Sequence, residues 1–281
     1  MERFRRPGPS PLGNRADLSL MVGFAEDFFS KSKSGQATLL SVLESAVSDD
    51  FTKGKNGVVA TPRGDVDPLT LYHIISVIKK ISNNQTPDGK AQYKDSEVSD
   101  YGFPEYQHDL GFRVEDLGDY VADLGAGVRS RFARDAEAIG ITVIGINPLL
   151  SLKAQRNKRR RTKILKRKIR DLPPATASTS SNLPLRDESM SSVVSHFGLS
   201  YFAAGLISLE DAVVSYREVY RILQPGGSAY IGPYRDDELV WGVAHIAAAG
   251  LTQNTTLHDL QSSRGLAFSM RITKPILSSR K

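Results

Sequence analysis

The sequence predicts an α/β fold in which strands and helices alternate around a doubly wound, mostly parallel sheet, preceded by a helical extension. Two apolar runs of strand length end at residues 124 and 146, and a helix-length segment separates them. Strand and helix signals continue to alternate to the end of the chain. With 281 residues, 40% of them hydrophobic, the chain suffices for one large domain, alone or with a small one.

The first hundred residues predict a separate part without a catalytic motif. Residues 1–16 are rich in Pro, Gly and Arg, and we expect a loose N-terminus there. Apolar residues at helical spacing then predict three helices, over 17–32, 35–49 and 67–82. The polar stretch 82–100 contains a Pro-Asp-Gly turn signal and predicts a linker. We therefore expect residues 17–100 to form a helical extension or cap, and residues 101–281 to form the main domain.

The main domain is predicted to hold seven strand-length runs with helices between them. The expected strands are 119–124, 141–146, 176–180, 192–196, 228–231, 252–257 and 266–273. The expected helices are 129–139, a helix from Pro148 through the basic run that follows, 208–223 and 237–249. Because the last two strands follow each other directly, we expect them to pair as a hairpin-like antiparallel edge.

A glycine-rich turn follows the first of these strands. Asp123 ends the strand, and Gly125, Ala126 and Gly127 follow, while Asn147 closes the second strand. Glycine at a strand end lets the backbone approach a ligand closely, and a polar residue ending the next strand can hydrogen bond a ribose. The pattern predicts a nucleotide-type site at the carboxyl edge of a parallel sheet.

Composition excludes several classes of site. The chain has no cysteine, so disulfides, thiolate metal sites and cysteine nucleophiles are excluded, and its five histidines show no metal-ligand spacing. We therefore expect no metal site. No apolar run approaches the ~18 residues that span a bilayer, and no apolar core follows the N-terminal arginines. These features predict a soluble intracellular protein, with the cytoplasm as the expected compartment and the nucleus left open.

The net charge of +6 is distributed very unevenly. Residues 153–170 contain eleven basic residues and no acidic one, so the rest of the chain is mildly acidic. These residues are Lys153, Arg156, Lys158, Arg159, Arg160, Arg161, Lys163, Lys166, Arg167, Lys168 and Arg170. So dense a basic block predicts an interaction element, and phosphate contact on RNA or DNA fits it better than base stacking because no aromatic residue interrupts it. An anionic partner protein, an anionic membrane surface and a nuclear-import signal remain alternatives.

Four segments together resemble a class I S-adenosylmethionine-dependent methyltransferase domain of the widespread small-substrate type. They are 121–127 (VADLGAG), 143–147 (VIGIN), 183–194 (LPLRDESMSSVV) and 217–227 (REVYRILQPGG). The resemblance covers about residues 110–275 and implies a Rossmann-like, seven-stranded sheet with S-adenosylmethionine over the ends of strands one, two and four. It implies donor binding by Asp123, Gly125, Ala126, Gly127, Asn147, Pro148 and Ser195. On family analogy, RNA is the expected nucleic acid.

The chain departs from the family pattern at several positions. Arg129 stands where the glycine-rich loop usually has its third glycine, and Asn147 replaces the acid that holds the ribose hydroxyls. Neutral residues also occupy two further positions that are often aspartate: Thr179 or Ser180, and Ser191. A dinucleotide-binding fold is disfavoured, because its third glycine is absent and no acidic residue ends the second strand.

His196 is the candidate general base, because it ends the fourth strand and its intrinsic pKa suits proton transfer near neutrality. The alternative is a packed or hydrogen-bonded histidine at the strand end. Methyl transfer from a sulfonium needs a base only when the acceptor must lose a proton. Without cysteine, methylation of pyrimidine C5 through a covalent adduct is excluded.

Two functions follow from these observations. The first is a methyltransferase acting on an unknown acceptor, with residues 153–170 holding a nucleic acid or another anionic substrate. The second is a catalytically inactive protein that keeps the fold and serves as an RNA-binding or assembly subunit.

Overall fold

The structure is a computed structural model. It describes residues 23–24, 27–29, 31–52, 59–61, 64–66, 71–72, 74–76, 78–79, 101–126, 131–147, 175–176, 178–200, 209–234, 236–262 and 265–276. The chain divides into two compact units, Met1–Gln85 and Thr86–Lys281. Among the described residues, no helix is both long enough and apolar enough to cross a membrane.

The N-terminal unit combines a helix with a short strand pair and buries several apolar side chains. Helix α2 (Lys33–Thr52) precedes two short antiparallel strands, β1 (Val59–Thr61) and β2 (Gly64–Val66). Its buried side chains are Phe24, Phe28, Leu43, Val59, Val66, Leu71, Ile74, Ile75 and Ile78. The apolar spacing located the helical segments correctly but did not reveal the strand pair, because three-residue strands are too short to show alternation. The extension is therefore not purely helical.

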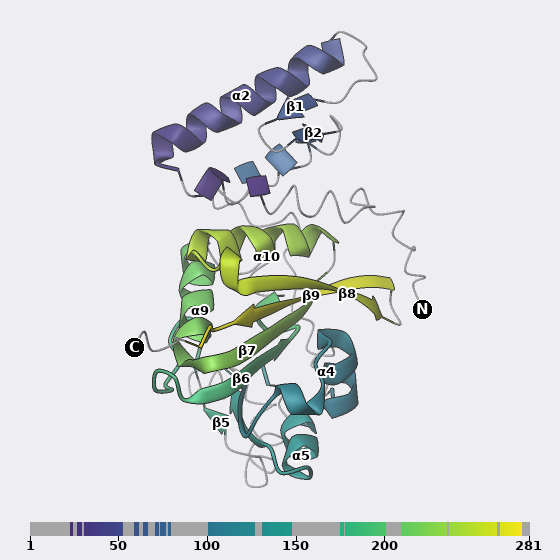
Figure 1. Cartoon of the computed structure of the whole chain (residues 1–281), viewed down its shortest axis with the longest axis vertical. Coiled ribbons are helices and arrows are strands. Elements are labelled where there is room, and N and C mark those ends of the chain that lie inside the picture. The colour runs from purple at the N-terminus through teal and green to yellow at the C-terminus, as the bar shows by residue number, and fades with distance from the viewer. Residues whose placement is uncertain are drawn as a thin grey trace, which may run out of the picture. The chain divides into compact units, whose positions relative to one another are not determined.

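The C-terminal unit is built on a seven-stranded sheet with the order β5-β4-β3-β6-β7-β9-β8 (Figure 1). The strands are β3 (Tyr120–Leu124), β4 (Thr142–Ile146), β5 (Ala175–Thr176), β6 (Met190–His196), β7 (Leu223–Tyr234), β8 (Thr255–Ser262) and β9 (Gly265–Thr273). The first five are parallel, whereas β9 and β8 run antiparallel at one edge. The predicted α/β, Rossmann-like class is confirmed, and so is the antiparallel pairing of the last two strands.

Two groups of helices accompany the sheet. Helices α4 (Phe103–Leu110) and α5 (Arg131–Glu137) share one hydrophobic cluster with β3, β4, β6 and β7. Helices α9 (Leu209–Ile222) and α10 (Asp236–Ala249) lie away from them, packed on each other and on β7 (Figure 1). Because the strands β3, β4 and β6 are parallel, their carboxyl ends meet at one edge of the sheet.

Helix α4 was not predicted, although the sequence carries its start and stop signals. Pro104 occupies the first turn, and the carboxylate of Glu105 accepts a hydrogen bond from the backbone N–H of Gly102 at 3.0 Å. Gly111 ends the helix in a left-handed conformation, with φ of +72°. Its eight residues include Gln107-His108-Asp109, which dilute the apolar stripe that would mark a longer helix.

Some strand bounds differ from the prediction for identifiable reasons. Strand β5 ends at Thr176, because a turn follows in which the N–H of Asn182 donates to the carbonyl of Thr179. Strand β7 begins at Leu223 although Pro225-Gly226-Gly227 predicted a turn. Gly226 and Gly227 instead exchange backbone hydrogen bonds with Lys274. The helix predicted from Pro148 lies outside the described residues.

Candidate functional site

The turn after β3 brings three segments of backbone together. Gly125 has φ of +87°, a left-handed conformation that favours glycine, and its N–H donates to the carbonyl of Ile146 at 2.9 Å. A Cβ at position 125 would lie 2.7 Å from the Cα of Gly198, in the segment after β6. The sequence predicted a close approach to a ligand, whereas the close approach found here joins two parts of the chain.

Gly198 was not predicted, and it is as constrained as Gly125. A Cβ on Gly198 would clash with the carbonyl oxygen of Leu124 and would lie 2.8 Å from Oγ of Ser195. The buried hydroxyl of Ser195 donates to the carbonyl of Leu124 at 2.9 Å and accepts the N–H of Leu199 at 2.6 Å. Ser195, predicted to bind the donor, therefore joins the end of β3 to the chain after β6 in this structure.

Asn147 holds the same turn from the side of β4. Its side-chain amide donates to the carbonyl of Ala126 at 2.5 Å, and its backbone N–H donates to the carbonyl of Thr176 at 3.1 Å. The residue is 6% exposed. A carboxylate at this position could not donate to Ala126, so the asparagine gives the turn a hydrogen bond that the family's usual acid cannot supply.

Asp123 is a buried carboxyl group at the end of β3. It is 1% exposed, and the hydroxyl of Tyr106 from α4 lies 3.1 Å from Oδ1 and 3.3 Å from Oδ2. Burial raises the pKa of Asp123 to about 7, and the hydrogen bond from Tyr106 opposes this rise. The carboxyl group therefore changes its charge near neutral pH. Tyr106 was not identified as a site residue from the sequence, because the helix that carries it, α4, was not predicted.

His196 ends β6 as predicted, and its side chain is fully covered. Its Nε2 lies 2.9 Å from Oδ2 of Asp109 in α4. Its ring stacks on Tyr106 at 4.6 Å and meets the rings of Tyr101 and Phe197 edge-on at 4.5 Å and 4.6 Å. In this arrangement His196 joins β6 to α4, and its role as general base stays a prediction.

Asp109 lies between two histidines. Its Oδ1 is 2.9 Å from Nδ1 of His108, and its Oδ2 faces Nε2 of His196. Burial alone would raise the pKa of Asp109, but the hydrogen bonds from His196 and His108 outweigh it and hold that pKa below its usual value. Asp109 is therefore ionised at neutral pH.

Several predicted site residues lie outside the described residues. They are Gly127, Pro148, Arg129 and all eleven basic residues of the segment 153–170. Gly125, Ala126, Asn147 and Asp123 are brought together at the carboxyl edge.

The neutral residues at family-acid positions make internal hydrogen bonds. The hydroxyl of Ser191 donates to the carbonyl of Tyr120 at 2.6 Å and accepts the N–H of the same residue at 2.9 Å. Ser180 Oγ lies 2.9 Å from Ser215 Oγ, and Thr179 Oγ1 lies 3.2 Å from Ser181 Oγ. These hydroxyls serve the packing of the domain.

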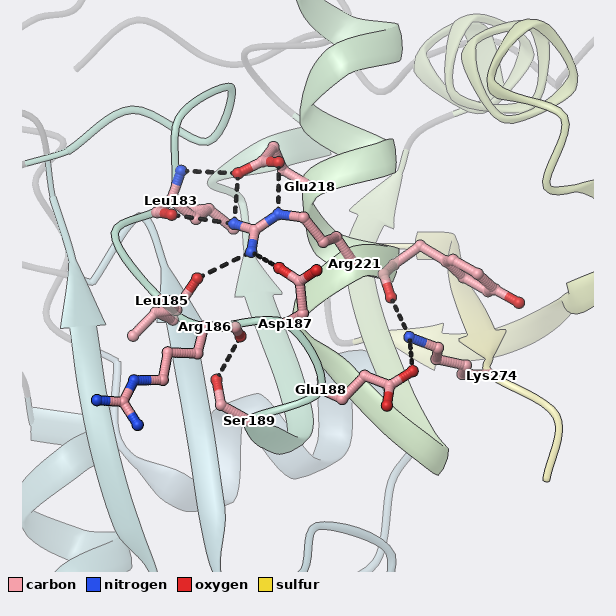
Figure 2. A network of polar contacts seen from close by, with 10 residues as sticks. Leu183, Leu185, Arg186, Asp187, Glu188, Ser189, Glu218, Arg221 and Lys274 are labelled. Carbon is pink, nitrogen blue, oxygen red and sulfur yellow. Dashed lines mark hydrogen bonds and ion pairs between the residues drawn. The ribbon is translucent and has the colours of Figure 1, made fainter. Parts of the chain in front are cut away.

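The third and fourth sequence motifs meet in one polar network (Figure 2). The guanidinium of Arg221 forms a two-pronged ion pair with Glu218, at 2.7 and 2.8 Å, and a further ion pair with Asp187 at 2.5 Å. It also donates to the carbonyls of Leu183 and Leu185, while Glu218 accepts the N–H of Leu183. The network therefore holds the loop before β6 against α9.

A comparison with family models gives a match to part of the chain. Residues 122–231 match the model of a methyltransferase domain. This match supports a class I S-adenosylmethionine-dependent methyltransferase domain in that part of the chain. S-adenosylmethionine is the cofactor of this family. Among curated proteins, no match was found.

Solved methyltransferase structures resemble the chain only distantly. A SAM-dependent methyltransferase from Methanosarcina mazei is 16% identical, over 56% of this chain and 93% of that one, with a TM-score of 0.37. YcgJ from Bacillus subtilis is 14% identical, over 60% and 99%, with a TM-score of 0.40. A geranyl diphosphate methyltransferase in complex with SAM is 15% identical, over 59% and 84%, with a TM-score of 0.37. Likenesses this weak add nothing to the assignment, which rests on the family model.

The described residues of the methyltransferase domain fit S-adenosylmethionine in their chemistry. The cofactor combines a positively charged sulfonium and ammonium with ribose hydroxyls. An acidic residue, Asp123, and an amide, Asn147, end adjacent parallel strands, and the tight turn at Gly125 lies between them. A carboxylate suits the positive charges, and the amide of Asn147 holds the turn beside them through its hydrogen bond to Ala126.

Proposed function

We propose that the chain is an active S-adenosylmethionine-dependent methyltransferase whose acceptor is a polyanion, with RNA as the first candidate. The family match supports the methyl donor. The basic segment 153–170 supports the class of acceptor.

The chain path between two described strands carries the proposal. Asn147 ends β4 at the carboxyl edge, and the basic segment begins only six residues later, at Lys153. Six extended residues span at most about 21 Å, so chain length alone keeps the backbone of Lys153 within that distance of Asn147. Arg170 is likewise only five residues from Ala175, the first residue of β5. The basic segment is therefore joined at both ends, by short connections, to strands of the sheet that carries the donor edge.

In the proposed reaction the chain contributes positioning and charge. When bound, S-adenosylmethionine supplies a methyl group activated by a positively charged sulfur. The turn at Gly125 and Ala126 would border the donor, Asn147 would fix that turn, and the carboxylate of Asp123 would attract the positive charge. Alignment and exclusion of water supply much of the rate in such in-line transfers. His196, held by Asp109, would take a proton only from an acceptor that must lose one.

The test is RNA binding as a function of salt, measured with a labelled structured RNA and the full chain. The double variant Arg159→Gln, Arg160→Gln removes two charges from the basic segment. Its control, Arg134→Gln, Arg186→Gln, removes two charges at exposed arginines elsewhere. We expect the first variant to reduce the slope of log K against log salt by about 1.4 to 1.8, and the control to leave it unchanged. Equal slopes for both variants would refute the RNA part of the proposal.

A second candidate is an inactive subunit that keeps the methyltransferase fold and binds RNA. The specific observation in its favour is that Asn147, Ser191 and both candidates for the third position, Thr179 and Ser180, make internal hydrogen bonds where the family usually carries acids. Incubation with S-adenosylmethionine labelled in the methyl group distinguishes the two. Transfer of label to RNA, protein or small acceptors supports the enzyme, whereas RNA binding without donor binding supports the subunit.

A further inference from the structure

The carboxyl group of Asp123 depends on a single described side chain. The phenol of Tyr106 has one proton and faces both carboxyl oxygens, at 3.1 and 3.3 Å, so it can donate fully to only one of them at a time. Asp123 itself is 1% exposed and lies near the end of β3, two residues before Gly125 in the following turn. A buried carboxylate with so few donors is costly to ionise.

Several charged groups of the neighbouring elements are paired with one another. In α4, Asp109 pairs with His196 of β6 and with His108. In α5, Arg131 pairs with Asp135 of the same helix at 3.8 Å and with Glu105 of α4 at 3.7 Å. Strand β4, which adjoins β3, carries no ionisable residue. Within the described part of the chain, no lysine or arginine forms an ion pair with Asp123, and Tyr106 alone opposes the effect of its burial.

We propose that Tyr106 is a positioning residue for binding of the methyl donor: its hydroxyl holds the carboxyl of Asp123 at the end of β3, where the carboxylate meets the donor's positive charge. This inference rests on the proposed function. Tyr106 does not touch the reacting atoms and acts through Asp123. Its ring is fixed for this task, because it stacks on His196 at 4.6 Å and on Phe132 at 4.2 Å.

The arrangement makes donor binding depend on pH. The form of Asp123 that attracts a cation is the ionised one, and burial raises the pKa of this carboxyl to about 7. Binding of the donor below pH 7 must therefore release a proton from Asp123, and affinity rises with pH until the carboxyl is ionised. Loss of the Tyr106 hydroxyl removes the hydrogen bond that lowers this pKa, so the rise in affinity moves to higher pH.

The test compares the full-length wild type with Tyr106→Phe and a matched control, Tyr216→Phe. Tyr216 also carries a buried, hydrogen-bonded hydroxyl, which lies 2.9 Å from that of Tyr234 between α9 and β7. Each protein is titrated calorimetrically with S-adenosylmethionine from pH 6 to 8.5, in two buffers of different ionisation enthalpy. The donor's own ionisations are common to all three titrations, so differences between the proteins report on the chain.

We expect wild-type affinity to rise by up to tenfold per pH unit below pH 7, with proton release on binding. Tyr106→Phe should bind several-fold more weakly at pH 7 and approach the wild type at pH 8.5, whereas Tyr216→Phe should follow the wild-type curve. A Tyr106→Phe curve that coincides with the wild type, or is lowered equally at every pH, overturns the inference but leaves the proposed function standing. Absence of wild-type binding at every pH overturns both.

Discussion

Gly125 and Gly198 pack backbone against backbone, since a Cβ on Gly125 would lie 2.7 Å from the Cα of Gly198. The contact joins the turn after β3 to the chain after β6, at the edge where the donor is expected. Two strands far apart in sequence are thereby set at a fixed separation. The shape of the site therefore requires that both residues lack a side chain.

The first prediction concerns this contact. Gly125→Ala should lower the free energy of unfolding by about 3 kcal/mol, from left-handed backbone strain plus overpacking, and should weaken donor binding. Gly140→Ala is the matched control: Gly140 has nearly the same φ, +84°, but nothing lies within 4 Å of its would-be Cβ. We expect the control to cost about 1 kcal/mol, measured by urea unfolding. Equal losses in the two variants would show that the contact with Gly198 has no energetic weight.

Asn147 provides the second prediction. Asn147→Asp should weaken donor binding and lower stability by about 1 to 3 kcal/mol, because it removes the hydrogen bond to Ala126 and sets a carboxylate against that carbonyl. Asn147→Ala, which removes the bond without adding repulsion, should be the milder variant. Calorimetric titration and thermal unfolding measure the two effects. Tighter donor binding by Asn147→Asp would mean that position 147 serves the ribose and not the turn.

The third prediction concerns the network around Arg221. Arg221→Lys cannot reproduce the two-pronged ion pair with Glu218 or both carbonyl contacts, so we expect a loss of about 2 to 3 kcal/mol in unfolding free energy. Arg217→Lys, on the same helix, gives up only one long hydrogen bond of 3.4 Å and should cost much less. Donor affinity should be retained in both variants, because the network precedes β6 and the donor edge follows it. A stability loss no larger than that of Arg217→Lys would contradict this account.

His245 supplies a prediction on acid stability. Burial lowers the pKa of His245 to about 3, and its Nδ1 has no hydrogen-bond partner among the described residues. Between pH 3 and 6.5, the unfolded chain binds a proton at His245 that the folded chain does not bind. The contribution of neutral His245 to stability is therefore complete above pH 6.5 and is lost as the pH falls toward 3. The loss approaches about 1.4 kcal/mol per pH unit. Asp123, whose pKa is raised, gives the opposite slope between pH 4 and 7, so the wild type alone does not isolate either group.

The difference between the wild type and His245→Gln isolates the histidine. Urea unfolding at pH 4, 5.5 and 7 should show the variant gaining stability relative to the wild type as the pH falls. A constant difference across this range would mean that folding does not lower the pKa of His245.

The sequence predicted the β-α-β unit and the order of the later strands because periodicity and glycine-rich turns are local signals. It did not predict α4, and with it missed Tyr106 and Asp109, which bind residues 17 and 87 positions away in the chain. The need for glycine at position 198 could not be predicted from the sequence either, because only the fold brings Leu124 beside it. The motifs placed Asp123 and His196 at the ends of their strands. The roles of these side chains depend on partners from other elements, such as Tyr106 and Asp109 of α4.

The measurement that tests the central claim most directly is calorimetric titration of the full chain with S-adenosylmethionine at pH 8. The account predicts micromolar binding by the wild type and by Gly140→Ala, and much weaker binding by Gly125→Ala and Asp123→Ala. No binding by the wild type up to millimolar donor would contradict it, and residues 153–170 would then be the main route to the function.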